Sequence, residues 1–100
     1  MIIKLRKGSK LFVRVDYKDG EKGLTHQDIQ DHLTYVGNVA KERYFLGGGF
    51  ANTDGGMCIY EATNIEEAQE VADNDPIIVS GLYRCEIFEW VLAILSGDQT

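Results

Sequence analysis

The chain has 100 residues, of which 44% are hydrophobic and 26% are charged, the proportions of one globular domain. Sixteen acidic residues against ten basic ones give a net charge of −6, which argues against nucleic acid as a partner, because phosphate binding needs clustered Lys and Arg. The longest apolar run, residues 90–95, is too short to cross a membrane, and the N-terminus lacks a signal peptide's apolar core. We therefore expect a cytoplasmic protein that binds neither nucleic acid nor membrane.

The first strand is predicted at residues 11–17, where apolar residues alternate with others. Residues 1–10 form an N-terminal arm before it, in which Ile2, Ile3 and Leu5 either extend the sheet or attach loosely. We expect one side of the strand to cover the helices: Leu11, Val13, Val15 and Tyr17. Three aromatic residues suggest a second apolar surface, which would need to be buried by another protomer: Phe12, Phe88 and Trp90.

A helix is predicted from Thr25 to about residue 43. Thr25 and Asp28 form a capping pair at its start. The apolar stripe of this helix follows at spacings of four, three and four: Ile29, Leu33, Val36 and Ala40.

Two further strands are predicted at residues 44–51 and 57–62, joined by a hairpin turn at 52–56 that is built on Asp-Gly. The run Gly47-Gly48-Gly49 lies inside the first of them. Glycine within a strand favours a bulge, and the alternative is a pocket wall that admits a small ligand near the end of the first helix. Cys58 and Cys85 each stand alone in strand-like runs, so no zinc or redox motif is indicated and no metal or cofactor is expected.

A second helix is predicted to begin at a capping box of Thr63 and Glu66, and Ile65, Ala68 and Ala72 mark its buried face. Asp75 falls on that same face and precedes the single proline, Pro76. An unpaired buried carboxylate is costly, so Asp75 needs a partner. It can cap a short helix that opens with Pro76, accepting from the backbone of Ile78 or its neighbour, and it can also orient a histidine.

Two histidines, His26 and His32, lie on opposite flanks of the first helix's apolar stripe, and periodicity does not choose between them. His32 lies one full turn further from the helix start, and Asp75 points inward from the other helix. The two side chains can therefore converge, directly bonded at ~2.6–3.2 Å or through one water, as the minimum for acid–base catalysis. We take His32 and Asp75 as the candidate catalytic pair.

The last strand is predicted at residues 83–95, followed by a tail at 96–100. The order strand, helix, strand, strand, helix, strand is the split βαβ of ferredoxin-like folds, an α+β class with an antiparallel sheet. We expect both helices on one face of a four-stranded sheet and a homodimer formed over the other face. Four residues are secondary candidates for substrate binding: Arg14, Gly49, Tyr83 and Arg84. Of these, Arg14, Tyr83 and Arg84 are candidates for holding an anionic substrate.

Several segments resemble the YciI-like (YCII-related) domain family. They are His32-Leu33, the glycine-rich second strand, residues 56–62, Glu66-Glu67-Ala68 and residues 72–76, and the resemblance spans residues 11–95 of a single domain, 1–100. It implies a fold like that of muconolactone isomerases, in which ferredoxin-like protomers pair into a dimeric α+β barrel. It also implies a His–Asp active site, whose members match His32 and Asp75 here, whereas His26 has no counterpart.

This chain departs from the family pattern at three places. Gly49-Phe50 stands where the family often has Gly-Pro, Ile77 replaces an aromatic residue after Asp-Pro, and about ten residues precede the first strand. An assigned activity in the family is an elimination on a chlorinated hydroxyquinone.

Three functions follow from the residues and the resemblance. The first is a cofactor-independent small-molecule lyase or isomerase that works by proton transfer at His32 and Asp75. The second is a non-catalytic dimeric ligand-binding or accessory module of the same fold. The third is a cofactor-independent monooxygenase.

Overall fold

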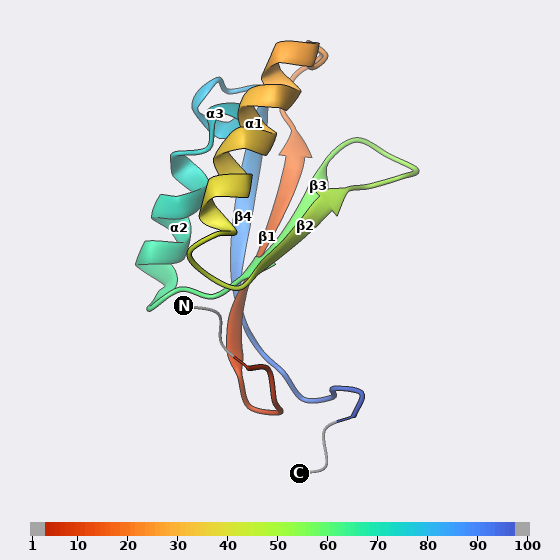
Figure 1. Cartoon of the computed structure of the whole chain (residues 1–100). Coiled ribbons are helices and arrows are strands. Elements are labelled where there is room, and N and C mark those ends of the chain that lie inside the picture. The colour runs from red at the N-terminus through yellow and green to blue at the C-terminus, as the bar shows by residue number, and fades with distance from the viewer. Residues whose placement is uncertain (1–3, 98–100) are drawn as a thin grey trace.

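The computed structural model describes residues 4–97. Their elements run β1 (Lys10–Lys18), α1 (His26–Val39), β2 (Phe45–Gly49), β3 (Gly56–Tyr60), α2 (Ile65–Asp73), α3 (Pro76–Val79) and β4 (Tyr83–Val91). The strands form one antiparallel sheet in the order β2-β3-β1-β4. The helices cover one face of this sheet and leave the other open (Figure 1). The predicted ferredoxin-like α+β fold is confirmed, with the short α3 added before the last strand.

The side of β1 that faces the helices is the opposite of the predicted one. Phe12, Arg14 and Asp16 are buried beneath the helices, whereas Tyr17 is exposed on the open face. The register places Val13 beside Phe88 and Ile59, and Val15 beside Met57, on that open face. The expectation that Val13, Val15 and Tyr17 face the helices is therefore wrong, as is the expectation that Phe12 belongs to the second apolar surface. Leu11, the fourth residue of the expected set, is buried and lies beside Trp90 in the register. The charged side of β1 turns inward because Arg14 pairs there with Asp75 and Asp16.

Helix α1 begins as predicted and ends earlier. The Thr25 hydroxyl accepts from the Asp28 amide, and the Asp28 carboxylate accepts from the Thr25 amide, which completes the capping box. The helix ends at Val39 rather than near residue 43, because the amides of Lys41 and Glu42 bond three residues back and tighten the chain into turns. None of the α1 residues is fully buried.

Helix α2 begins one residue later than predicted. Asn64 is the N-cap, and its side chain accepts from the Glu67 amide at 2.8 Å. Glu67, rather than Glu66, reaches back, and its carboxylate accepts from the Thr63 amide at 3.1 Å. Ala68 and Ala72 are completely buried as expected, whereas Ile65, the first residue of the helix, is 42% exposed, so the expectation for Ile65 is wrong.

The β2–β3 hairpin is regular through all three glycines. Gly47, Gly48 and Gly49 pair in unbroken register with Cys58, Met57 and Gly56, so the predicted bulge is wrong. Close approach explains two of the glycine positions: a Cβ at Gly47 would lie 2.8 Å from Cys58 Sγ, and one at Gly56 would lie 2.6 Å from the Gly48 carbonyl oxygen.

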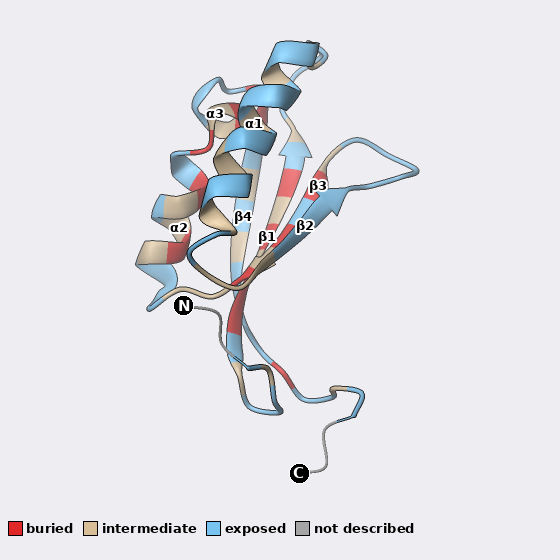
Figure 2. Cartoon of the chain, viewed as in Figure 1, coloured by how far each residue is buried: buried red, intermediate tan, exposed pale blue. Residues whose placement is uncertain are grey.

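The main core lies between the sheet and α2, where Phe12, Cys58, Tyr60 and Ala68 are buried together. The Tyr60 hydroxyl donates to the Ala68 carbonyl at 2.6 Å, which satisfies the one polar atom of that ring. Buried positions gather on β1, β3 and α2, whereas α1 and β2 are mostly exposed (Figure 2). The α1 side of the molecule is therefore thinly packed.

Strand β4 ends at Val91 instead of residue 95, and Leu92 continues its pairing with Gly8 and Ser9 of the N-terminal arm. The described part of the arm thus attaches to the sheet, while Ile2, Ile3 and residues 98–100 lie outside the described residues. No helix within residues 4–97 combines the length and the apolar character that a membrane crossing requires.

Candidate active site

Asp75 is held at the junction of α2 and α3 by its role as a helix cap. Its Oδ1 accepts from the Ile77 amide at 3.1 Å, and Pro76 occupies the first helical position. The predicted cap is confirmed. The residue is completely buried, so its carboxylate is fixed in place before any other partner is considered.

The second oxygen of Asp75 meets the histidine. His32 Nδ1 lies 2.7 Å from Asp75 Oδ2, a direct hydrogen bond within the predicted range. His32 projects from the middle of α1, and its side chain is 21% exposed, whereas His26 is exposed at the start of the same helix. The geometry therefore brings together the pair that the sequence singled out.

Two further charged groups stand behind this pair on β1. Arg14 Nη1 lies 2.9 Å from Asp75 Oδ2. Its Nε and Nη2 donate to the two carboxylate oxygens of Asp16 at 2.7 and 2.9 Å, a bidentate ion pair. Arg14 is almost completely buried and thus bridges two carboxylates. The buried charges are tolerable because each one is paired.

The electrostatics of the site determine the tautomer of His32. Burial raises the pKa of Asp75, but the hydrogen bond from His32 and the charge of Arg14 outweigh burial and hold that pKa below its usual range. Asp75 is therefore an ionised acceptor at neutral pH, and the shared proton belongs to His32 Nδ1. In neutral His32, Nε2 is then an unprotonated base, and within residues 4–97 the one side-chain hydrogen bond of His32 is made by Nδ1.

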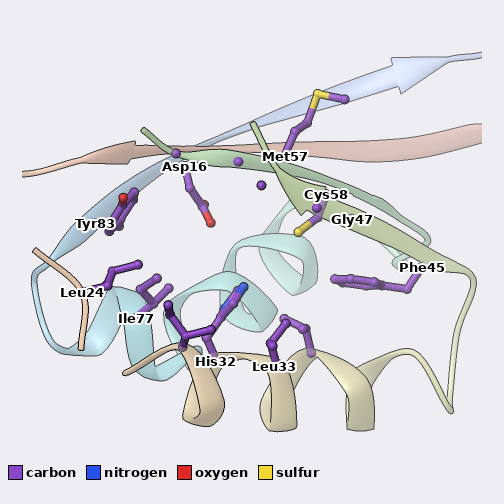
Figure 3. Close-up of a pocket in the computed structure, with 16 residues that line it drawn as sticks. Asp16, Leu24, His32, Leu33, Phe45, Gly47, Met57, Cys58, Ile77 and Tyr83 are labelled. Carbon is purple, nitrogen blue, oxygen red and sulfur yellow. The ribbon is translucent and has the colours of Figure 1, made fainter. Parts of the chain in front are cut away.

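His32 lines a cavity of about 250 Å³ between α1 and the β2–β3 hairpin. One wall is apolar and comes from α1, with Ile29, Leu33 and Val36. The opposite side is the backbone of the glycine segments 47–49 and 55–56. Figure 3 shows the His32 ring directed from α1 toward the sheet. The apolar stripe of α1 is incompletely buried because it borders this cavity instead of packing against the sheet.

Three other lining residues, Asp16, Cys58 and Tyr83, bring polar atoms to the sheet side of the cavity. Burial raises the pKa of the Cys58 thiol to about 11, so this cysteine is protonated at neutral pH and is a poor nucleophile. Among residues 4–97 no group of three or more His, Cys, Asp or Glu side chains is placed to hold a metal ion.

The secondary candidates divide between the cavity and other places. Gly49 and Tyr83 line the cavity, which agrees with the pocket-wall interpretation of the glycine run. Arg14 does not line it and is fully engaged by Asp16 and Asp75. Arg84 lies on the open face of the sheet, with its guanidinium 4.5 Å from the centre of the Tyr17 ring.

Asp16 is the site residue that sequence reasoning did not single out. Its signal was present, because Arg14 and Asp16 are two apart on one strand and therefore share a face. An Arg and an Asp on the same face of a central strand make a buried ion pair, provided that this face is the one turned toward the helices.

Three known proteins or families are similar to the chain. A family model for the YCII-related domain matches residues 11–91. An uncharacterised protein from Bacillus subtilis strain 168, YjpA, is 32% identical over 82 residues, which cover 82% of this chain and 91% of that protein. The solved structure of 5-chloro-2-hydroxyhydroquinone dehydrochlorinase from Burkholderia phenoliruptrix AC1100, in complex with 2,5-dihydroxybenzoquinone, matches with a TM-score of 0.57 and 22% identity. That match covers 80% of this chain and 92% of the other, and it supports the fold.

Proposed function

The chain belongs to the YCII-related domain family, and on that premise we propose that it is a small-molecule enzyme of the lyase or isomerase type, in which His32 transfers protons. One observation carries this proposal. The Nδ1 of His32 is bound to a buried, ionised Asp75, which leaves Nε2 as a base beside a cavity of about 250 Å³.

The chemistry follows from the two ends of the imidazole. Nε2 accepts a proton from a carbon or hydroxyl of the substrate, and Asp75 stabilises the imidazolium that forms. The electron pair left on the substrate then expels a leaving group in an elimination. In an isomerisation it shifts instead, and His32 returns the proton to another atom. Asp75 is a positioning residue in this scheme, because His32 lines the cavity whereas Asp75 does not.

Elimination on a small ring compound is the first reaction to test, because the structurally similar protein is named as a dehydrochlorinase and its complex holds 2,5-dihydroxybenzoquinone. The test substrate is 5-chloro-2-hydroxyhydroquinone, and the readout is chloride release. A parallel assay follows deuterium exchange at activated C–H bonds of cyclic ketones. We expect turnover by the wild-type protein and a loss of about 100-fold or more in His32→Ala.

His26→Ala is the matched control, because it removes an exposed histidine from the same helix. Equal rates for wild type and His32→Ala would contradict the proposal. Repeating the assay under nitrogen separates the reaction from a cofactor-independent monooxygenase, which needs oxygen whereas elimination and isomerisation do not.

The alternative of a non-catalytic binding module is supported by the predominantly apolar lining of the cavity, which suits retention of a ligand as well as its conversion. Binding of 5-chloro-2-hydroxyhydroquinone without chloride release, at equal affinity in wild type and His32→Ala, would favour this alternative.

We further propose that two protomers pair over the open face of the sheet. Large apolar side chains remain about 40–50% exposed on that face, although helices cover the other: Leu46, Met57, Phe88 and Trp90. A contiguous apolar surface of this kind on a sheet favours a self-complementary contact between copies.

A further inference from the structure

We propose that Asp16 is the residue that recognises the substrate, and that it selects a neutral ring compound bearing a hydroxyl group over an anionic one. This inference rests on the proposed function in one respect, since it takes the cavity beside His32 as the substrate site.

Asp16 and His32 face the cavity from opposite walls. Asp16 projects from β1 in the sheet, and His32 projects from α1 (Figure 3). In the figure the carboxylate of Asp16 points toward the side from which the His32 ring rises. A small ring lying between them can therefore meet the base at one edge and the carboxylate at another.

The carboxylate of Asp16 retains free acceptor sites. Each of its oxygens receives one hydrogen bond from Arg14, at 2.7 and 2.9 Å. A carboxylate has about four lone-pair sites, so about two remain after these bonds. Both oxygens of Asp16 are held in a bidentate ion pair with the guanidinium, and the carboxylate of such a pair accepts hydrogen bonds but donates none. The group that it recognises on a ligand must therefore be a donor.

The charge around the cavity disfavours an anion. None of the described lining residues is Lys or Arg. The nearby guanidinium of Arg14 is paired with two carboxylates, with Nε and Nη2 on Asp16 and Nη1 on Asp75, so its single positive charge is already more than balanced. A carboxylate or phosphate entering the cavity would meet Asp16 without a free cation to offset the repulsion. The proposal is therefore an alternative to the expectation that Arg14, Tyr83 and Arg84 hold an anionic substrate.

A ligand without any donor is disfavoured for a different reason. Filling the cavity removes water from Asp16, which is already only 6% exposed. The free lone pairs of the carboxylate then lose their hydration, and a ligand without a hydroxyl leaves them unpaired. A hydroxyl on the ring restores that hydrogen bond, so it is a requirement for binding.

Three probes separate these requirements on the wild-type protein by isothermal titration calorimetry. Hydroquinone is neutral and carries two donors, 1,4-dimethoxybenzene lacks donors, and 4-hydroxybenzoate adds a negative charge. We expect hydroquinone to bind about tenfold or more tightly than either of the others, because one hydrogen bond to a charged group is worth about that factor. Equal or tighter binding of 4-hydroxybenzoate, or no binding of hydroquinone at millimolar concentration, would overturn the proposal.

Asp16→Asn then tests the residue. We expect its affinity for hydroquinone to fall about tenfold and the discrimination against 4-hydroxybenzoate to disappear. Asp19→Asn, which neutralises an exposed carboxylate just beyond the end of β1, should change neither quantity. Unaltered affinities in a folded Asp16→Asn variant would contradict the role assigned to Asp16. Should that variant fail to fold, the order of the three probes on the wild-type protein decides.

The proposal is separable from the proposed catalysis. His32→Ala should keep the preference for hydroquinone, because recognition depends on the opposite wall. Selective binding in the absence of any turnover would therefore overturn the enzyme while leaving the recognition by Asp16 standing.

Discussion

Asp75 combines three interactions in one buried carboxylate: it caps α3, pairs with Arg14 and orients His32. The sequence predicted the cap from the adjacent Pro76. It predicted the histidine contact from the inward direction of Asp75 and the position of His32 one turn into its helix, and the family resemblance pointed to the same pair. The contact between Arg14 and Asp75 depends on which face of β1 turns toward the helices, and no local sequence pattern around Arg14 indicates that face.

The first prediction concerns the stability of Asp75→Ala. This substitution leaves the buried Arg14 with one carboxylate instead of two and removes the α3 cap. We expect the free energy of unfolding to fall by about 3 kcal/mol or more, measured by urea denaturation. The control is Asp73→Ala, which removes an exposed carboxylate at the end of α2 and should cost about 0.5 kcal/mol or less. Similar losses in the two variants would contradict the account.

The second prediction is the pH dependence of the same interaction. The pKa of Asp75 in the folded protein lies below the ordinary value of 3.8, so the unfolded chain takes up this proton first as the pH falls. The stability that Asp75 contributes is therefore complete above the unfolded pKa and disappears as the pH falls through the lower, folded pKa. Compared with Asp75→Asn, the wild-type advantage in unfolding free energy should be constant above about pH 5 and shrink below about pH 4. An advantage that does not shrink in acid would be inconsistent with a lowered pKa.

At the scale of elements, periodicity together with capping and turn residues identified the strands and helices, while strand phase and exact helix starts needed the folded structure. Successive side chains of β1 point to opposite faces of the sheet, and both faces receive apolar residues. The more apolar of the two sides faces away from the helices. The buried side was hard to recognise because it carries two charged residues, Arg14 and Asp16. The helix-side partner of Arg14 is Asp75, which is far away along the chain. The glycines of β2 were open to two interpretations for a similar reason, since the cavity that they border is bounded by a helix distant in sequence.

The third prediction compares two glycines of β2. A Cβ at Gly47 would lie 2.8 Å from Cys58 Sγ and 3.2 Å from the Met57 carbonyl oxygen, so Gly47→Ala should reduce stability by about 1–3 kcal/mol. At Gly49 the nearest atom would be the Gly55 carbonyl oxygen at 3.8 Å, so Gly49→Ala should fold normally and narrow the cavity instead. Thermal unfolding and hydroquinone titration of the two variants measure these effects. Loss of stability in Gly49→Ala with none in Gly47→Ala would contradict the packing described.

At the scale of the whole molecule, the sheet has one face covered by helices and one face that the single chain leaves open (Figure 1). The fold could be predicted from the order of elements because each has a clear period or cap. The proposed dimer cannot be predicted in the same way, because the order of elements does not say what covers the open face of the sheet. It is argued from the exposed apolar side chains of β2, β3 and β4.

The fourth prediction is that the protein is a dimer at micromolar concentration in light scattering. Phe88→Lys places a charge within the proposed contact and should give monomers, because an unpaired buried charge is costly. Val79→Lys is the matched control, since Val79 is 71% exposed but lies on α3, on the helix side of the sheet. A well-behaved wild-type monomer, or equal dissociation in both variants, would contradict the dimer.

The most direct test of the central claim is the protonation state of the two ring nitrogens of His32. Nitrogen-15 NMR of the imidazole, at a pH high enough for both histidines to be neutral, distinguishes the nitrogen that carries the proton, and the exposed His26 serves as an internal reference. The account predicts a proton on Nδ1 of His32 and an unprotonated Nε2, with this preference lost in Asp75→Ala. A proton on Nε2 and a bare Nδ1 would contradict it, because the nitrogen that borders the cavity would then not be a base.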